Sequence, residues 1–328
     1  MSEPVLSIRG LRTSFRTPQG MLPAVDGVDL DLHAGETLGV VGESGCGKTV
    51  TALSILRLIP EPPGSIDAGE ITFAGQDLMA MPTSELRRIR GRRIAMIFQE
   101  PMTSLNPVLR VGHQIEEVLQ VHTELARAAR RARVVELLDL VGVPAPDERA
   151  RDYPHQLSGG LRQRVMIAMA LACDPDVLIA DEPTTALDVT IQAQILDLLE
   201  SLKRRFNMAV MLITHDLGIV AEVAQRVAVF YAGRVVETGA VGEIFRSPRH
   251  PYTRGLMRAM PGPQSRRREP LHVIPGVVPD LVDRPSGCSF RDRCERAIGL
   301  CSRSDPVLKQ FGGGHAAACH NPEARVGP

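Results

Sequence analysis

The chain has 328 residues, in which 38 Lys and Arg balance 38 Asp and Glu, and aromatic residues make up only 3%. Zero net charge and the absence of Trp argue against a nucleic-acid partner, which would need a basic surface or stacking aromatic side chains. The longest apolar run, residues 165–173, is far shorter than the ~20 residues that cross a bilayer, and residues 1–9 do not resemble a secretory signal. Any role at a membrane would therefore depend on a partner protein.

Short β-branched segments separated by glycine turns dominate the first part of the chain. Residues 5–15 and 25–32 are predicted to be strands, and residues 37–41 form a continuous apolar strand of the kind that is buried in a parallel sheet. Residues 48–59 have the pattern of a helix, which Pro60 would end. Residues 94–98 are predicted to form another buried strand.

Helical patterns dominate the middle of the chain. Apolar residues recur at helical spacing from residue 111 to residue 141, and residues 158–173 predict a further helix. Residues 177–180 and 209–214 are short apolar strands, and the helix predicted at residues 189–206 lies between them. This strand–helix–strand order predicts an α/β fold with a parallel sheet.

The composition changes after about residue 245, where proline, arginine and glycine become frequent. Such a composition is typical of an extended segment with little regular structure. We therefore expect one domain over residues 1–245, with a helical insert at about residues 100–160, and an irregular extension over residues 246–328.

A glycine-rich motif between a predicted strand and a predicted helix is the strongest functional signal. The residues that would cradle nucleotide phosphates are Gly42, Glu43, Ser44, Gly45, Cys46, Gly47, Lys48, Thr49 and Val50. The glycines let backbone N–H groups surround the phosphates, and the helix start adds a favourable dipole. Lys48 would neutralise the β- and γ-phosphates, and the Thr49 hydroxyl would bind Mg²⁺. The flanking strand and helix disfavour the alternative, a turn that binds nothing, and no Asn-Lys-x-Asp guanine-recognition motif occurs.

Two acidic residues, Asp181 and Glu182, follow the apolar strand at residues 177–180. Charges at the end of a buried strand are costly unless they meet a cation. Asp181 is suited to hold Mg²⁺ through water, and Glu182 is suited to polarise the attacking water as a general base. For this pair taken alone, an ordinary solvent-exposed turn is the alternative.

A second glycine-rich helix start follows Leu157. Ser158 is a candidate N-cap, and Gly159 and Gly160 would let the backbone approach an anion closely. This stretch alone favours an ordinary cap with a glycine-rich turn over a second phosphate-binding helix start.

The order of these motifs resembles the ATP-binding cassette of ABC transporters over about residues 5–245. The positions that match the family's adenine-stacking aromatic, Q-loop glutamine, signature, D-loop acid and switch histidine are Phe15, Gln99, Ser158, Gly159, Gly160, Asp188 and His215. In the family, the Q-loop glutamine contacts Mg²⁺ and senses the transporter, the signature contacts ATP held by the opposite subunit, and the histidine contacts the γ-phosphate. One departure is Leu161, where the family usually has the glutamine that ends the signature.

The resemblance implies a fold and a set of partners. The implied fold is a P-loop ATPase cassette with a RecA-like parallel-sheet core, an antiparallel β subdomain and an α-helical insert. Two cassettes would pair head to tail, so that each ATP lies between Lys48 of one and Ser158 of the other. The implied partners are two transmembrane permease subunits, a second and paralogous ATP-binding subunit, and an extracytoplasmic solute-binding protein. The chain would then be a peripheral protein at the cytoplasmic face of the membrane.

Two segments further resemble the oligopeptide and dipeptide importers within this family. They are the Q-loop at residues 98–107 and the segment at residues 247–259 that follows the cassette. Members of this subfamily often lack the signature glutamine, which fits Leu161. The resemblance implies ATP-driven peptide import. Import of nickel, glutathione or an oligosaccharide, and a non-transport ABC ATPase, remain alternatives.

The extension contains Cys288, Cys294, Cys301 and Cys319. Disulfides are disfavoured in the reducing compartment expected for a protein that uses ATP. Zinc bound by four thiolates is possible, although the usual C-x2–4-C spacing is absent, and unliganded thiols are another alternative. Similar extensions in this importer subfamily are associated with a [4Fe–4S] cluster, which four cysteines of varied spacing can hold. We therefore expect a [4Fe–4S] cluster at these cysteines.

Overall fold

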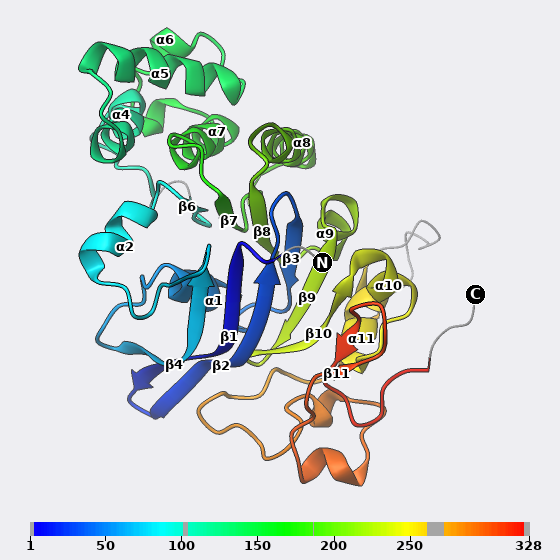
Figure 1. The fold of residues 1–328 in the computed structure, drawn as a ribbon. Coiled ribbons are helices and arrows are strands. Elements are labelled where there is room, and N and C mark those ends of the chain that lie inside the picture. Colours follow the sequence, from blue (N-terminus) through cyan, green and yellow to red (C-terminus); the bar gives the residue numbers. More distant parts are fainter. Residues whose placement is uncertain (1–2, 101–103, 186, 261–271, 325–328) are drawn as a thin grey trace. The chain divides into compact units, whose positions relative to one another are not determined.

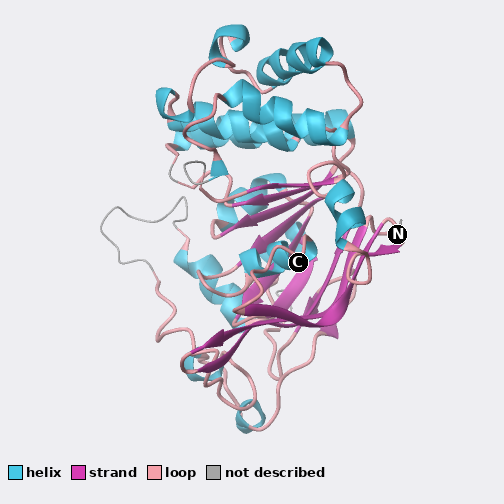
Figure 2. Cartoon of the chain, turned by 90° about the vertical axis from the view of Figure 1, so that its left-hand side faces the viewer, coloured by secondary structure: helices cyan, strands magenta, loops and turns pink. Residues whose placement is uncertain are grey.

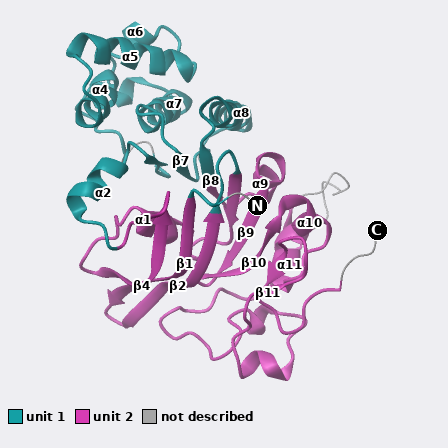
Figure 3. Ribbon diagram, viewed as in Figure 1, with its two compact units in different colours: residues 1–5, 32–36, 80–211 teal, residues 6–31, 37–79, 212–328 magenta. Residues whose placement is uncertain are grey.

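In a computed structural model of the chain, residues 3–100, 104–185, 187–260 and 272–324 are described (Figure 1). They form two compact units (Figure 3). Unit 1 consists of Met1–Val5, Leu32–Glu36 and Ala80–Met211, and unit 2 of Leu6–Asp31, Thr37–Met79 and Leu212–Pro328. None of the helices described is both long enough and apolar enough to cross a bilayer.

Unit 1 is mainly helical. Its elements are α2 (Thr83–Ile89), β6 (Ile94–Ile97), α4 (Val111–His122), α5 (Arg127–Leu140), α6 (Pro146–Arg149), the 3-10 turn η1 (Pro154–Gln156), α7 (Gly159–Ala170), β7 (Val177–Asp181) and α8 (Val189–Phe206). The helices from α4 to α7 pack against one another, and Figures 1 and 2 show them as one group. Strands β6 and β7 are parallel neighbours, with Ile97 opposite Ala180. β8 (Ala209–Thr214) lies next to β7 and runs on into unit 2.

Unit 2 contains an antiparallel sheet at its N-terminal end. The strands are β1 (Leu6–Thr17), β2 (Gly20–Leu32), β4 (Gly64–Phe73) and β5 (Gln76–Asp77), in the order β2-β1-β4-β5. Strands of 10 to 13 residues pair here and bury apolar side chains along their length, such as Leu6, Ile8 and Leu11 on β1. The antiparallel β subdomain expected from the family resemblance is therefore present.

A second set of strands in unit 2 includes β3 (Thr37–Val41), which directly precedes the glycine-rich motif at residues 42–50, and two short strands of the extension. β3 is parallel to β9 (Arg226–Tyr231), and the order continues through β10 (Arg234–Ala240), β12 (Ala316–Ala317) and β11 (Lys309–Gln310), all antiparallel. The other elements of this unit are α1 (Lys48–Ile55), α9 (Leu217–Val223), α10 (Val241–Arg246), α11 (Pro251–Ala259) and the 3-10 turns η2 (Arg291–Arg293) and η3 (Gly299–Ser302).

Most predicted elements are present, with two differences. The helix predicted at residues 48–59 ends at Ile55, because Leu56 leaves the helical conformation and Arg57 is left-handed with a φ of 49°. The extension has more regular structure than predicted, since α11 begins at Pro251 and β12 adds a strand to β10 through Glu237 and Thr238. Two-residue strands leave no periodic pattern by which a sequence could reveal them.

Candidate functional site

The phosphate-cradling motif forms a tight loop between β3 and α1, in unit 2. Gly42 has a φ of 154° and Gly47 a φ of 100°. A Cβ at Gly42 would collide with the carbonyl oxygen of Phe230, and a Cβ at Gly47 would collide with that of Ala24. The loop can take this shape only because both positions are glycine.

Lys48 begins α1 and is 5% exposed. Its Nζ donates hydrogen bonds to the carbonyl oxygens of Gly42 (2.8 Å) and Glu43 (3.0 Å), and it lies 3.7 Å from Cys46 Sγ. Burial raises the pKa of the Cys46 thiol in spite of this neighbouring ammonium, so the thiol stays neutral. A buried ammonium held by carbonyl oxygens can exchange them for the stronger acceptors of a phosphate group.

The other predicted members of the loop are accessible to different degrees. Ser44 and Gly45 are exposed, and Thr49 and Val50 are half-buried on the first turn of α1. The predicted adenine-stacking residue Phe15 is half-buried near the end of β1, opposite Gly64. His215 is exposed immediately after β8, where Asp216 caps α9 by accepting hydrogen bonds from the N–H groups of Gly218 and Ile219.

The predicted acidic pair lies in unit 1 at the carboxyl end of β7. Asp181 is the last residue of the strand and is 1% exposed. Glu182 is left-handed with a φ of 47°, and its Oε2 accepts hydrogen bonds from Gln99 Nε2 (3.0 Å) and Thr185 Oγ1 (2.8 Å). The structure thus brings Glu182 and Gln99 together at the ends of two parallel strands, the edge at which α/β sheets bind their ligands.

The predicted signature also lies in unit 1. Ser158 caps α7 by accepting a hydrogen bond from the Leu161 N–H (3.4 Å), which confirms the predicted cap. Asp188 caps α8 in the same way through the Ile191 N–H (2.9 Å). A Cβ at Gly160 would lie 2.9 Å from Ile191 Cγ2, so the small residue lets the two helix starts approach. Ser158 and Gly159 are both exposed.

Two residues of the extension contact the phosphate loop, and the sequence offered no signal for either. Arg293 donates hydrogen bonds to both carboxylate oxygens of Glu43, at 2.7 and 2.9 Å. The Tyr252 hydroxyl accepts a hydrogen bond from the Glu43 N–H (3.0 Å). Arg293 and Tyr252 are 7% and 0% exposed. Two buried side chains of the extension therefore hold the partly exposed Glu43 of the loop.

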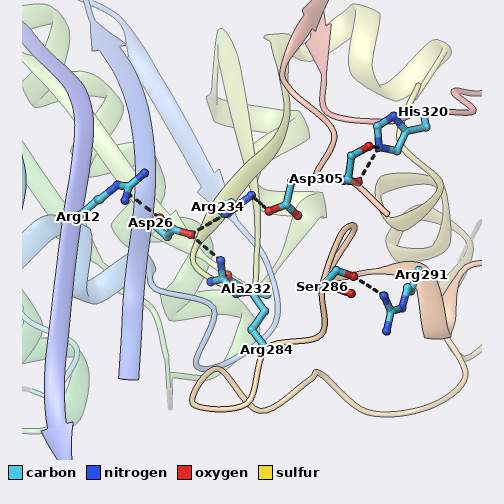
Figure 4. Close-up of polar contacts among 10 residues, drawn as sticks. Arg12, Asp26, Ala232, Arg234, Arg284, Ser286, Arg291, Asp305 and His320 are labelled. Atoms are coloured by element: carbon cyan, nitrogen blue, oxygen red, sulfur yellow. Dashed lines mark hydrogen bonds and ion pairs between the residues drawn. The ribbon is translucent and has the colours of Figure 1, made fainter. Parts of the chain in front are cut away.

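A second polar cluster fastens the extension to the strands of unit 2. Asp26 on β2 accepts hydrogen bonds from Arg234 on β10 (2.7 Å) and from Arg284 of the extension (2.6 Å), and Arg234 also pairs with Asp305 (Figure 4). Burial raises the pKa of Asp26, but the two arginines outweigh that effect and hold it below its usual value. Three segments distant in sequence thus meet at one ionised carboxylate.

The four cysteines of the extension lie within electrostatic range of one another. The pKa of Cys288 and the pKa of Cys319 are each raised to about 11, first by burial and also by charge on the other cysteines, Cys294 and Cys301 among them. None of these thiols is in a disulfide. Within the described ranges, no three His, Cys, Asp or Glu side chains are grouped as ligands of one metal ion.

The two histidines that flank Cys319 make hydrogen bonds to residues other than the four cysteines. His315 Nε2 lies 2.6 Å from Glu237 Oε1, and His320 Nε2 lies 2.8 Å from the carbonyl oxygen of Ser304. Glu237 is fully buried on β10 and also accepts the backbone N–H groups of Arg249 and His250. These contacts hold β12 and the start of α11 on β10.

Solved structures support the fold. The structure of a dimeric bacterial ABC transporter cassette matches this chain with a TM-score of 0.65 at 28% identity, over 72% of this chain and 98% of that chain. The structure of cbiO1 from Clostridium perfringens, part of the ABC transporter complex cbiONQ, matches with a TM-score of 0.62 at 26% identity, over 74% of this chain and 91% of that chain. The α/β P-loop cassette predicted from the sequence is therefore confirmed.

Family models and relatives agree with this fold. The model for the ABC transporter family matches residues 25–185, and that for the oligopeptide/dipeptide transporter C-terminal region matches residues 236–301. A probable peptide ABC transporter ATP-binding protein of Sinorhizobium fredii is 54% identical over 96% of this chain and 94% of its own length. The oligopeptide transport ATP-binding protein OppD of Bacillus subtilis is 52% identical over 93% of this chain and 85% of its own length. The chain therefore belongs to the family of ABC transporter ATP-binding proteins that carry the oligopeptide/dipeptide transporter C-terminal region.

Proposed function

We propose that this chain is the subunit that hydrolyses ATP to power the import of dipeptides and oligopeptides through an ABC transporter. One observation carries the proposal: a complete phosphate loop with Lys48 at its base lies in the same unit as an oligopeptide-type C-terminal region, and Arg293 joins the two. The choice of substrate is supported by relatives named for peptide, oligopeptide and dipeptide transport, which are 49% to 54% identical over nearly the whole chain.

In the proposed reaction, the phosphate loop binds ATP and Lys48 neutralises its β- and γ-phosphates. Glu182 acts as the general base on the attacking water, in an orientation set by its hydrogen bonds from Gln99 and Thr185. His215 contacts the γ-phosphate, and Phe15 stacks on adenine. Mg²⁺ would be held by the hydroxyl oxygen of Thr49, the amide oxygen of Gln99 and the carboxylate oxygen of Asp181, since oxygen ligands are those that Mg²⁺ prefers. The ion would offset negative charge on the phosphates.

The proposed motor is a pair of cassettes. The ATP site of each cassette is completed by residues of the other, namely Ser158, Gly159, Gly160 and Asp188. ATP binding therefore closes the pair, and hydrolysis reopens it. The exposed start of α7, with Ser158 as its cap, suits contact with a partner's phosphate. Two permease subunits, a paralogous second cassette and an extracytoplasmic solute-binding protein complete the transporter. The chain acts as a peripheral protein at the cytoplasmic face of the membrane.

Within this proposal, residues 1–245 are the nucleotide-binding domain, and its insert at about residues 100–160 receives the permease. Residues 246–328 are the oligopeptide-type extension. A nickel, glutathione or oligosaccharide importer would use the same motor, so only transport itself distinguishes the substrates.

The substrate is tested by reconstituting the chain with its permeases, second cassette and binding protein in lipid vesicles. We expect ATP-dependent uptake of labelled dipeptides and oligopeptides, and none of nickel or glutathione. Glu70→Gln on the exposed face of β4 is a control that should leave uptake unchanged. Uptake of another solute with no peptide uptake would contradict the peptide assignment and leave the motor assignment intact.

For the four cysteines, we propose a structural [4Fe–4S] cluster. Four cysteine side chains that lie near enough to raise one another's pKa are the donor set that such a cluster takes, with the thiols losing their protons when they bind iron. A cluster of four irons is larger than a single ion, so its thiolate ligands stand further apart than those of zinc.

Anaerobic purification followed by iron and acid-labile sulfide analysis tests this proposal. We expect a coloured protein with iron and sulfide in equal amounts, and loss of both in Cys288→Ser. The buried Cys46 lies in the phosphate loop, whereas Cys173 is outside both sites, so Cys173→Ser is the matched control. A colourless, iron-free protein that contains zinc would overturn the cluster.

A further inference from the structure

The phosphate loop is held on its outer side by the C-terminal extension. Glu43, the residue after Gly42, makes hydrogen bonds through its backbone N–H, its side-chain carboxylate and its backbone carbonyl. Its N–H donates to the Tyr252 hydroxyl (3.0 Å), its carboxylate accepts both terminal nitrogens of Arg293, and its carbonyl accepts the Lys48 ammonium (3.0 Å). When Lys48 turns to a phosphate, the Glu43 carbonyl keeps a long hydrogen bond from the Cys46 N–H (3.4 Å), and the contacts with Tyr252 and Arg293 hold the N–H and the side chain of Glu43.

Arg293 is itself rigidly supported. Its Nε donates to the Pro275 carbonyl oxygen (3.0 Å), and its guanidinium lies 5.8 and 5.9 Å from the ring centres of Tyr231 and Phe290. Tyr231, Tyr252 and Phe290 are buried and pack against one another, with ring centres 4.6 to 5.4 Å apart. A bidentate arginine–carboxylate pair next to packed aromatic rings fixes the orientation of the carboxylate as well as its distance from the guanidinium.

We propose that Arg293 and Tyr252 are positioning residues of the ATP site, which hold the Glu43 peptide so that the phosphate loop stays open for nucleotide. They touch the loop and not the reacting atoms, so they act on ATP affinity and not on the chemical step. Because Arg293 directly precedes Cys294, the four-cysteine segment supports the loop through this side chain. The inference rests on the proposed ATP-binding role and is independent of the transported solute and of what the cysteines bind.

The test measures Mg-ATP affinity and steady-state ATP hydrolysis for variants of the full-length chain. Arg293→Ala should raise the Kd and the KM for ATP about tenfold with kcat within twofold of wild type, since one charge-assisted pair is lost. Arg293→Lys, which keeps the charge but not the two-pronged geometry, should recover part of the affinity. Tyr252→Phe should raise the Kd about threefold, because the Glu43 N–H loses its acceptor.

Arg296→Ala is the matched control, because Arg296 lies two residues after Cys294 and pairs with Asn321 and Glu323 within the extension. It should leave the Kd for ATP unchanged. If Arg293→Ala does not fold, Arg293→Lys and Tyr252→Phe decide the question. Unchanged ATP affinity in these variants, a fall in kcat at constant KM, or an equal effect of Arg296→Ala would overturn the inference. Failure of the wild-type chain to bind ATP would instead overturn the proposed function.

Discussion

Replacing Glu182 with Gln is expected to lower ATP hydrolysis by the purified chain by about 10³-fold, within the range that general-base catalysis contributes. Glutamine has nearly the same shape and can keep the hydrogen bond with Thr185, but its amide cannot take a proton from water. Mg-ATP should still bind with a Kd within a few fold of wild type, because the phosphate loop is untouched. Phosphate release and calorimetric titration measure the two quantities separately.

The exposed Glu70 provides the control for this prediction. Glu70→Gln changes the charge by the same amount on β4, and it should leave hydrolysis and binding as in the wild type. A Glu182→Gln chain that still releases phosphate at more than a third of the wild-type rate would show that another group activates the water.

Replacing Lys48 with Ala is expected to raise the Kd for Mg-ATP about 100-fold, because charge-assisted hydrogen bonds to two phosphates are lost. Lys48 is almost fully buried and donates to Gly42 and Glu43, so the variant must also be shown to fold, by its thermal unfolding without nucleotide. Competition with a fluorescent ATP analogue gives the Kd.

Lys309 is exposed on the short strand β11, so Lys309→Ala removes one positive charge at a surface position. That variant should bind Mg-ATP as the wild type does. Equal affinity of the Lys48→Ala and Lys309→Ala chains for Mg-ATP would show that the nucleotide binds somewhere other than the glycine-rich loop.

Buried apolar segments with clear ends were predictable from the sequence. The strands at residues 37–41 and 209–214 and the helix at residues 189–206 have the predicted bounds, because each is a continuous apolar or amphipathic run between turn residues. The glycines of the phosphate loop were predictable too, since backbone that approaches other backbone so closely admits no side chain.

Contacts between distant segments were not predictable. Arg293 and Glu43 are 250 positions apart, and no periodicity or motif links an arginine of a proline-rich segment to a loop near the N-terminus. The early end of α1 depends on a left-handed Arg57, a conformation that a sequence pattern rarely reveals. The spacing of the four cysteines left several ligands open, because thiol geometry depends on the fold around them.

In the proposed motor, Lys48, Asp181 and Glu182 act on the same Mg-ATP, and a second cassette completes the site through Ser158. The most direct measurement is an experimental structure of the Glu182→Gln chain, bound to Mg-ATP, in complex with its permeases and second cassette. We expect Lys48 Nζ on the phosphates, Asp181 beside Mg²⁺, and Ser158 on the γ-phosphate of the neighbouring cassette's ATP. Nucleotide bound away from Lys48, or a closed pair in which Ser158 faces solvent, would contradict this arrangement.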